Sequence, residues 1–188
     1  MALEAALEKL CSDLGHFLDT LTGLETTVTE DQPESGEVVL VGKVSDAITE
    51  IESHCRECID AAESALSAVN HPFDANRLRR SLSGSQVQFQ SIAHLLVFDL
   101  LTYETISALV GFGAEHGHGW QAWVRAVRMG LEECRSGIRE LDRSYLACWE
   151  EIAERLFAGP ISLHTTNIGQ QISAGALDAK GREEAGMT

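Results

Sequence analysis

Apolar side chains recur every three or four residues along most of the first 158 positions, which is the spacing of one face of an α-helix. Turn-forming or helix-breaking residues interrupt this spacing at DQPESGE, at Pro72 and in the glycine-rich stretch 111–119. Asp74 is placed to cap the N-terminus of a helix, and SLSGS at 81–85 is a candidate kink. We therefore expect four long helices, over residues 3–30, 38–70, 74–110 and 120–157.

Short connections between long amphipathic helices favour antiparallel neighbours. The pattern thus predicts an all-α protein, an up-down-up-down four-helix bundle of long helices over residues 1–158. An extended coiled coil, an open helical layer and a domain-swapped dimer are the alternatives. Residues 159–188 lose the helical spacing after Pro160 and are expected to form a flexible C-terminal tail.

The formal net charge is −15, and residues 1–70 hold 15 of the 29 acidic side chains against three basic ones. Such acidity disfavours nucleic-acid binding, because Lys and Arg contacts to phosphate supply most of that affinity. No apolar run reaches the roughly 20 residues that span a bilayer, so we expect a soluble protein without membrane contact. Five scattered cysteines and no secretory leader indicate a reducing cytoplasm.

The segment SHCREC brings His54, Cys55 and Cys58 close together, which raises the question of a metal or redox site. On a helical wheel Cys55 lies within the apolar stripe and Cys58 at its margin, which favours packing in the core. A zinc site needs four ligands, and the sequence offers no second CxxC. We predict no cofactor, while a metal site using these residues stays open as an alternative.

Catalytic motifs are missing from the sequence, which has neither a phosphate-binding loop nor a nucleophile elbow. A di-iron bundle would require two Glu-x-x-His pairs, and only Glu115 and His118 have this spacing. We therefore expect a protein that is not an enzyme.

Asp99 lies within the apolar run LLVFDLLTY, so the wheel places its carboxylate on the apolar side of the third helix. A buried charge is costly unless it is paired. We predict a buried polar group that fixes helix register through a hydrogen bond, with a polar anchor at a partner interface as the alternative.

An arginine stripe follows the fourth helix within an arc of about 80°. Its members are Arg125, Arg128, Arg135, Arg139 and Arg143. We expect these arginines to pair across helices with the acidic first two segments. The alternatives are an interface with an acidic partner and a phosphate-rich ligand.

Residues 161–172, ISLHTTNIGQQI, alternate in part between apolar and polar side chains and favour extended backbone. We predict a docking peptide here that orders on a partner, with a plain linker as the alternative. Its candidate contact residues are Ile161, Leu163, Asn167, Ile168 and Ile172.

Together these features predict a non-enzymatic helical adaptor or scaffold subunit that binds other proteins, within a homo- or hetero-oligomer. One alternative is a bundle that binds a metal, haem or a small apolar ligand through His and Cys. The second is contact with phosphate or nucleic acid through the arginine stripe.

Overall fold

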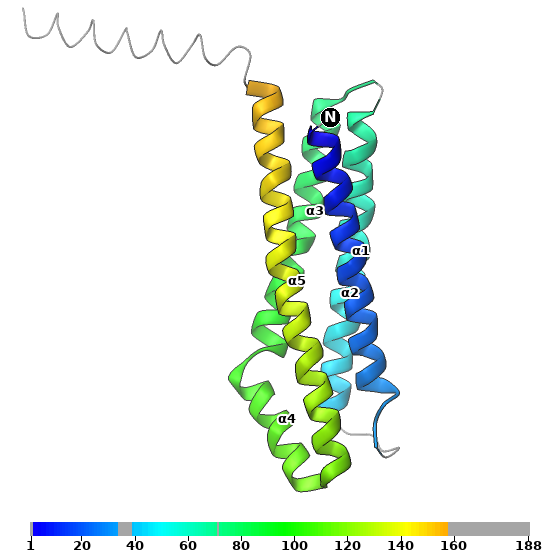
Figure 1. The fold of residues 1–188 in the computed structure, drawn as a ribbon, viewed down its shortest axis with the longest axis vertical. Coiled ribbons are helices and arrows are strands. Elements are labelled where there is room, and N and C mark those ends of the chain that lie inside the picture. Colours follow the sequence, from blue (N-terminus) through cyan, green and yellow to red (C-terminus); the bar gives the residue numbers. More distant parts are fainter. Residues whose placement is uncertain (1, 34–38, 71, 158–188) are drawn as a thin grey trace, which may run out of the picture. The chain divides into compact units, whose positions relative to one another are not determined.

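The computed structural model describes residues 2–33, 39–70 and 72–157, whose regular structure is entirely helical, as expected (Figure 1). The chain divides into two compact units, Met1–Cys148 and Trp149–Thr188, and the core and candidate site described below lie in the first. In chain order the helices are α1 (Ala2–Thr29), α2 (Val39–Val69), α3 (Ala75–Leu95), the π-helix η1 (Leu96–Leu100), α4 (Tyr103–His116) and α5 (His118–Phe157).

The apolar face predicted for the first helix is the face that α1 buries. All eight positions at the three-and-four spacing are buried, and the polar residues between them are mostly exposed. Burying leucine, valine and phenylalanine side chains stabilises the fold by about 1.5–3 kcal/mol each. These residues are Leu3, Leu7, Leu10, Leu14, Phe17, Leu21, Leu24 and Val28.

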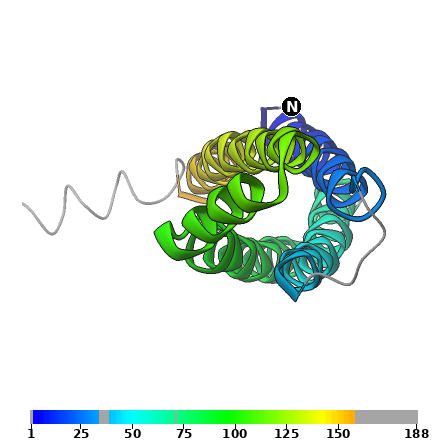
Figure 2. The same ribbon diagram turned by 90° about the horizontal axis from the view of Figure 1, so that it is seen from below.

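α1 packs against α2, and the two helices run antiparallel. Thr22 donates a hydrogen bond to Glu52 at 3.2 Å, and one turn further along α1, Glu25 accepts one from Thr49 at 3.2 Å. Residue numbers therefore rise on α1 as they fall on α2. Figure 2 shows α2 between α1 and α3.

α2 and α3 are antiparallel by the same criterion. His54 Nδ1 lies 2.7 Å from Gln88 Oε1, and the hydroxyls of Ser64 and Ser81 are 3.1 Å apart. The predicted N-cap is confirmed, because the Asp74 carboxylate accepts hydrogen bonds from the first free amides of α3.

α5 packs along α1, and the residues of α5 that contact α1 recur every seven positions. They are Trp123, Gly130, Gly137 and Ser144. The two glycines allow close approach, since a Cβ at Gly137 would lie 2.6 Å from a ring carbon of Phe17. A Cβ at Gly130 would lie 2.8 Å from a methyl of Leu24. As residue numbers rise on α5 they fall on α1, so this pair is also antiparallel.

A polar group inside the core ties together α2, α3 and α5. Ser85 Oγ donates its hydrogen to the Cys58 carbonyl at 2.8 Å. The Tyr145 hydroxyl lies 2.5 Å from Ser85 Oγ and, because the serine hydrogen is already used, donates to it. The Tyr145 ring also packs on Phe89, with centroids 5.0 Å apart. Within the described ranges no buried side-chain nitrogen or oxygen is left without a hydrogen-bond partner.

The expected third helix is divided, but the break does not lie at 81–85, the candidate kink. α3 runs through that stretch, and the chain changes conformation at η1, where the Leu101 amide donates to the Leu96 carbonyl at 2.9 Å. Thr102 then caps α4 by accepting from the Thr105 amide at 3.1 Å. A π turn followed by a new N-cap explains the break, because the Thr102 backbone is extended and no longer helical.

The direction of the chain changes by 49° between Ala75–Leu100 and Tyr103–His116. No single helix in the described ranges is long and apolar enough to cross a membrane. This bent pair meets the same test of length and composition only when its two parts are taken together.

Replacing a glycine by alanine should have opposite effects on stability inside and outside the contact of α5 with α1. Gly137→Ala should lower the free energy of unfolding by about 1–3 kcal/mol, because a methyl group would press on the rigid Phe17 ring. Gly84→Ala, in the interior of α3 with nothing within 4 Å, should raise it by about 0.5–1 kcal/mol. Urea unfolding followed by circular dichroism measures both, and a stabilised Gly137→Ala protein would contradict the packing described.

Candidate functional site

The two cysteines of SHCREC are core residues, as predicted. Cys55 and Cys58 are fully buried, and their thiols donate to main-chain carbonyls, Cys55 to Leu14 and Cys58 to Ser85 at 3.2 Å. Burial raises the pKa of the Cys55 thiol to about 12 and that of Cys58 to about 11. A thiol with so high a pKa is protonated at neutral pH, which makes it a poor nucleophile.

The His54 ring faces α3, where Gln88 is its hydrogen-bond partner. Within residues 2–33, 39–70 and 72–157, no three His, Cys, Asp or Glu side chains come together as a metal site would require. The structure thus gives the metal alternative no support in the part of the chain it describes.

The arginine stripe is exposed, but its predicted pairing with the acidic segments is wrong. Arg135 pairs with Glu132 at 3.5 Å and Arg143 with Glu140 at 2.5 Å, both within α5. The remaining three, Arg125, Arg128 and Arg139, form no ion pair with any carboxylate in the described ranges. The reason is the rotation of α5: the residues that face α1 lie about 180° around the helix from the stripe.

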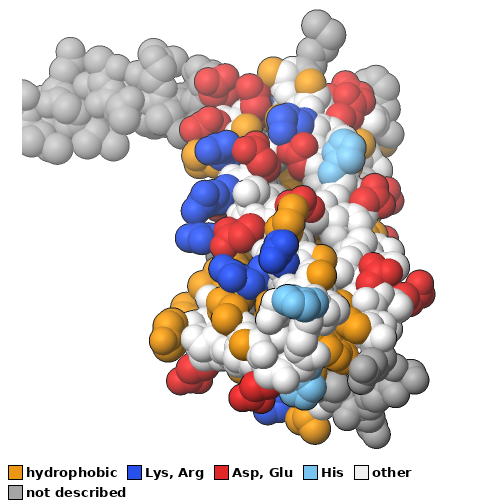
Figure 3. Space-filling view, turned by 60° about the horizontal axis from the view of Figure 1, so that its bottom comes forward, with side chains coloured by type: hydrophobic (Ala, Val, Ile, Leu, Met, Phe, Trp, Pro, Cys, Tyr) orange, Lys and Arg blue, Asp and Glu red, His pale blue; other side chains and the backbone are white. Residues whose placement is uncertain are grey.

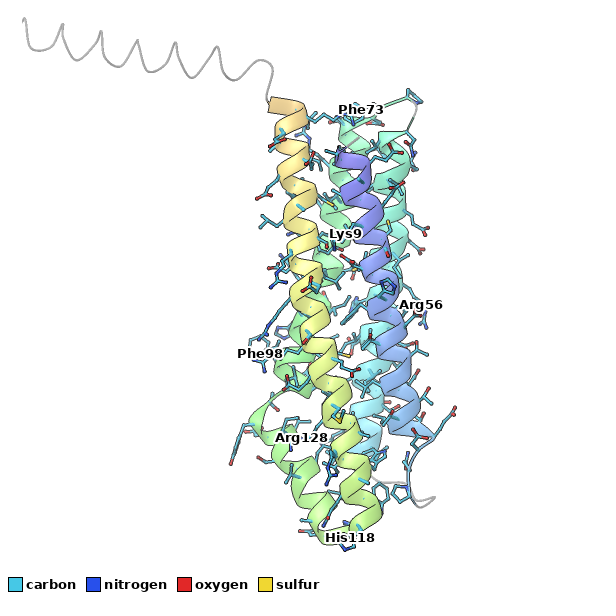
Figure 4. All side chains as sticks on the ribbon, viewed as in Figure 1. Lys9, Arg56, Phe73, Phe98, His118 and Arg128 are labelled. Atoms are coloured by element: carbon cyan, nitrogen blue, oxygen red, sulfur yellow. The ribbon has the colours of Figure 1, made fainter. Side chains whose placement is uncertain are left out.

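The prediction that Asp99 is buried is also wrong. Its side chain is exposed, as are those of Val97 and Phe98 beside it, and Figure 4 shows Phe98 on the outer side of η1. The wider turn of η1 shifts the angular position of these residues, so a wheel drawn at 100° per residue misplaces them. Only the main chain of Asp99 makes a described contact, accepting from Thr105 Oγ1 at 2.8 Å.

α4 and α5 form a hairpin that is closed at one end and open at the other. At the closed end the turn passes through Gly117, whose φ of +91° is a conformation that glycine adopts without strain. Gly113 packs directly on α5, where an added Cβ would lie 3.1 Å from a Val124 methyl. At the open end, where α4 begins, the two helices leave a hollow between them.

This hollow has a volume of about 520 Å³. A second hollow of about 280 Å³ lies toward the closed end, and Arg125 and Arg128 line both. We call the two together the α4–α5 groove. Its lining comprises Leu101, Ile106, Arg125, Arg128, Met129, Glu132 and Glu133 in the first hollow, and Val110, Gly113, Ala114, Gln121 and Val124 with the two arginines in the second.

Large apolar side chains are exposed on η1, α4 and α5, the helices that form or adjoin the groove. Tyr103 is 86% exposed and Phe98 63%, although both belong to residue types that proteins usually cover. Figure 3 shows hydrophobic side chains beside a group of basic ones on this face of the molecule. The exposed apolar residues of η1, α4 and the neighbouring part of α5 are Val97, Phe98, Tyr103, Val110 and Met129.

The groove was not predicted from the sequence, although a signal was present. LLVFDLLTY is apolar on every side of a helix, and a helix of this kind must be covered on every side or leave apolar surface exposed. The docking segment 161–172, with Ile161, Leu163, Asn167, Ile168 and Ile172, lies outside the described residues.

Comparison with protein-family models, with curated proteins and with solved structures found no match to this chain. The groove combines a concave apolar floor with two arginines that have no ion-pair partner in the described ranges, and the adjoining elements η1 and α4 expose the aromatic side chains of Phe98 and Tyr103.

The burial of the cysteines predicts site-specific protection from alkylation. At pH 8 about one Cys55 thiol in ten thousand would be ionised, since its pKa is about 12. Brief treatment of the folded protein with N-ethylmaleimide should therefore modify the half-buried Cys11 well before Cys55, Cys58 or Cys134. Peptide mass spectrometry measures the four rates, and labelling of Cys55 as fast as Cys11 would contradict its place in the core.

Proposed function

We propose that this chain is a non-enzymatic helical adaptor or scaffold subunit that binds another protein through the α4–α5 groove. The observation that carries the proposal is the exposed apolar surface around a concave site in the described part of the chain. Contiguous apolar surface on a soluble protein is typical of an interaction site. Aromatic residues, methionine and arginine are the types enriched at the centre of protein interfaces. Met129 and two arginines line the groove, and the aromatic side chains of Phe98 and Tyr103 are exposed on η1 and α4.

The same proposal takes α1, α2, α3 and α5 as an up-down-up-down four-helix bundle that carries α4 as a side arm. The antiparallel contacts of α1 with α2, α2 with α3, and α1 with α5 support this topology. In such a protein the bundle supplies a rigid support, and α4 with the adjoining turn of α5 supplies the binding surface.

Two further parts of the proposal concern the remaining chain and its compartment. Residues 161–172 would form a second docking element, extended when bound to a partner. The five buried or half-buried thiols suit a reducing cytoplasm; they are Cys11, Cys55, Cys58, Cys134 and Cys148.

The two alternative functions receive less support from the geometry. Among the described residues that line the groove there is no His or Cys, so these supply none of the ligand chemistry of a haem or metal site. Contact with nucleic acid would have to overcome a net charge of −15, and Glu132, Glu133 and Glu140 lie among the arginines.

A substitution in the groove tests the protein-binding role. Met129→Glu places a charge in the apolar hollow and should abolish a stoichiometric complex isolated from the native host, because an apolar side chain of the partner would have to displace the water bound to the new carboxylate. Leu146→Glu is the matched control, since Leu146 is a similarly exposed apolar residue on α5 outside the groove. Light scattering after size exclusion gives the mass of each complex, and equal retention by both variants would exclude the groove as the interface.

A truncation tests the docking segment separately. A chain ending at residue 158 should keep its helicity and melting temperature, because the helical spacing of apolar residues in the sequence ends before that residue. It should lose the partner that residues 161–172 recruit. Circular dichroism and the same mass measurement follow the two effects, and a truncated chain that retains every partner would leave this segment as a linker.

A further inference from the structure

We propose that Arg125 and Arg128 form a two-point clamp for carboxylates, and that the α4–α5 groove selects an acidic amphipathic helix of a partner protein. The inference depends on the proposed adaptor function and adds the chemical class of its partner. The clamp would hold two Asp or Glu side chains spaced one helical turn apart, beside a bulky apolar residue that enters the larger hollow.

The geometry of the two arginines suits this role. They are three residues apart on α5, so both project from the same side of the helix about one turn apart, and both border the two hollows. Neither has an ion-pair partner within the described ranges. A guanidinium group offers paired N–H donors that match a carboxylate, so two exposed arginines at this spacing can bind two carboxylates at the matching spacing.

The charge along the groove changes sign over about one turn of α5. Arg125 and Arg128 are followed by Glu132 and Glu133, and Glu132 is partly neutralised by Arg135 at 3.5 Å. A partner helix would therefore place its carboxylates opposite the arginines and a neutral or basic residue opposite Glu133. Such an arrangement fixes the direction in which the partner lies.

The apolar floor defines the second half of the recognition. Leu101, Ile106 and Met129 line the hollow next to the two arginines, and its volume of about 520 Å³ is large enough for a leucine or phenylalanine side chain. An apolar anchor in this hollow would shield the neighbouring ion pairs from water. Shielded ion pairs of this kind gain specificity from complementary charge.

Other occupants fit the groove less well. Residues 161–172 of this chain contain no Asp or Glu, so they offer nothing to the two arginines. A second copy could present the acidic side of α1 or α2, but in the described ranges Val39 is the sole exposed large apolar residue on those helices. An anionic membrane would meet a concave site on a molecule with a net charge of −15.

The experiment measures binding of designed peptides to the full-length protein by fluorescence anisotropy. The probes are amphipathic helical peptides of about 16 residues with a leucine or phenylalanine anchor and two glutamates three or four residues apart. Their controls have glutamine at both glutamate positions. We expect at least one glutamate peptide to bind about tenfold or more tightly than its glutamine control.

The protein variants assign that difference to the clamp. Arg125→Gln with Arg128→Gln should weaken glutamate-peptide binding about tenfold or more and leave binding of the glutamine peptide nearly unchanged. Arg139→Gln removes an equally exposed arginine outside the groove and should have less than about a twofold effect. Thermal melting of each variant checks that the fold is intact.

Three results would overturn the proposal: equal binding of glutamate and glutamine peptides, an equal loss for Arg139→Gln, or arginine-dependent binding to phosphatidylcholine–phosphatidylserine vesicles with no binding to any peptide. The adaptor function is judged separately by Met129→Glu. If that variant loses its native partner while the peptides show no charge preference, the groove remains a protein-binding site and the acidic class is wrong.

Discussion

The rotation of α5 against α1 is the constraint on which the candidate site depends. Gly130 and Gly137 let the two backbones approach, with Leu24 and Phe17 filling the space that larger side chains would occupy. A helix that makes close contacts at every seventh residue can present only that face to its neighbour, so its rotation about its own axis is fixed. That rotation turns the arginine stripe outward, away from the acidic residues of α1, and it places Arg125 and Arg128 next to α4. The same contact that orders the core therefore sets the charge of the groove.

Polar groups inside the core support this rotation. Tyr145 reaches from α5 to Ser85 on α3, and Ser85 in turn binds the main chain of α2. On the α1 side, Ser144 donates to the Asp13 carboxylate, which also pairs with Lys9. Each of these hydrogen bonds forms only at one rotation of α5 about its axis and one position along that axis. They therefore fix the register of a helix interface whose apolar contacts alone would tolerate sliding.

The sequence predicted the helical class well because α1, α2 and α5 each have one apolar face. The spacing in α1 identifies its eight buried residues, and Asp74 marks the start of α3. The prediction of which side chains are buried failed where the apolar residues do not mark one face of the helix. LLVFDLL is apolar all round, so nothing in it reveals the π turn that exposes Asp99 and Phe98. The partners of the arginines depended on the orientation of α5, which small residues such as Gly137 determine through tertiary contacts. The groove needs both features, which explains why it was missed.

The π turn at η1 has an evolutionary meaning as well as a structural one. A turn closed by a bond between residues five apart contains one residue more than an α-helical turn, so it is equivalent to a single-residue insertion. Such an insertion leaves α3 in place and redirects everything that follows it. Loss of one residue between Leu96 and Leu100 would rotate the residues that follow by about 100° relative to α3 and so change the side chains that face α5, while leaving the α1–α2 interface intact. Gain or loss of one codon at this point would thus change the candidate groove without changing the helices that precede it.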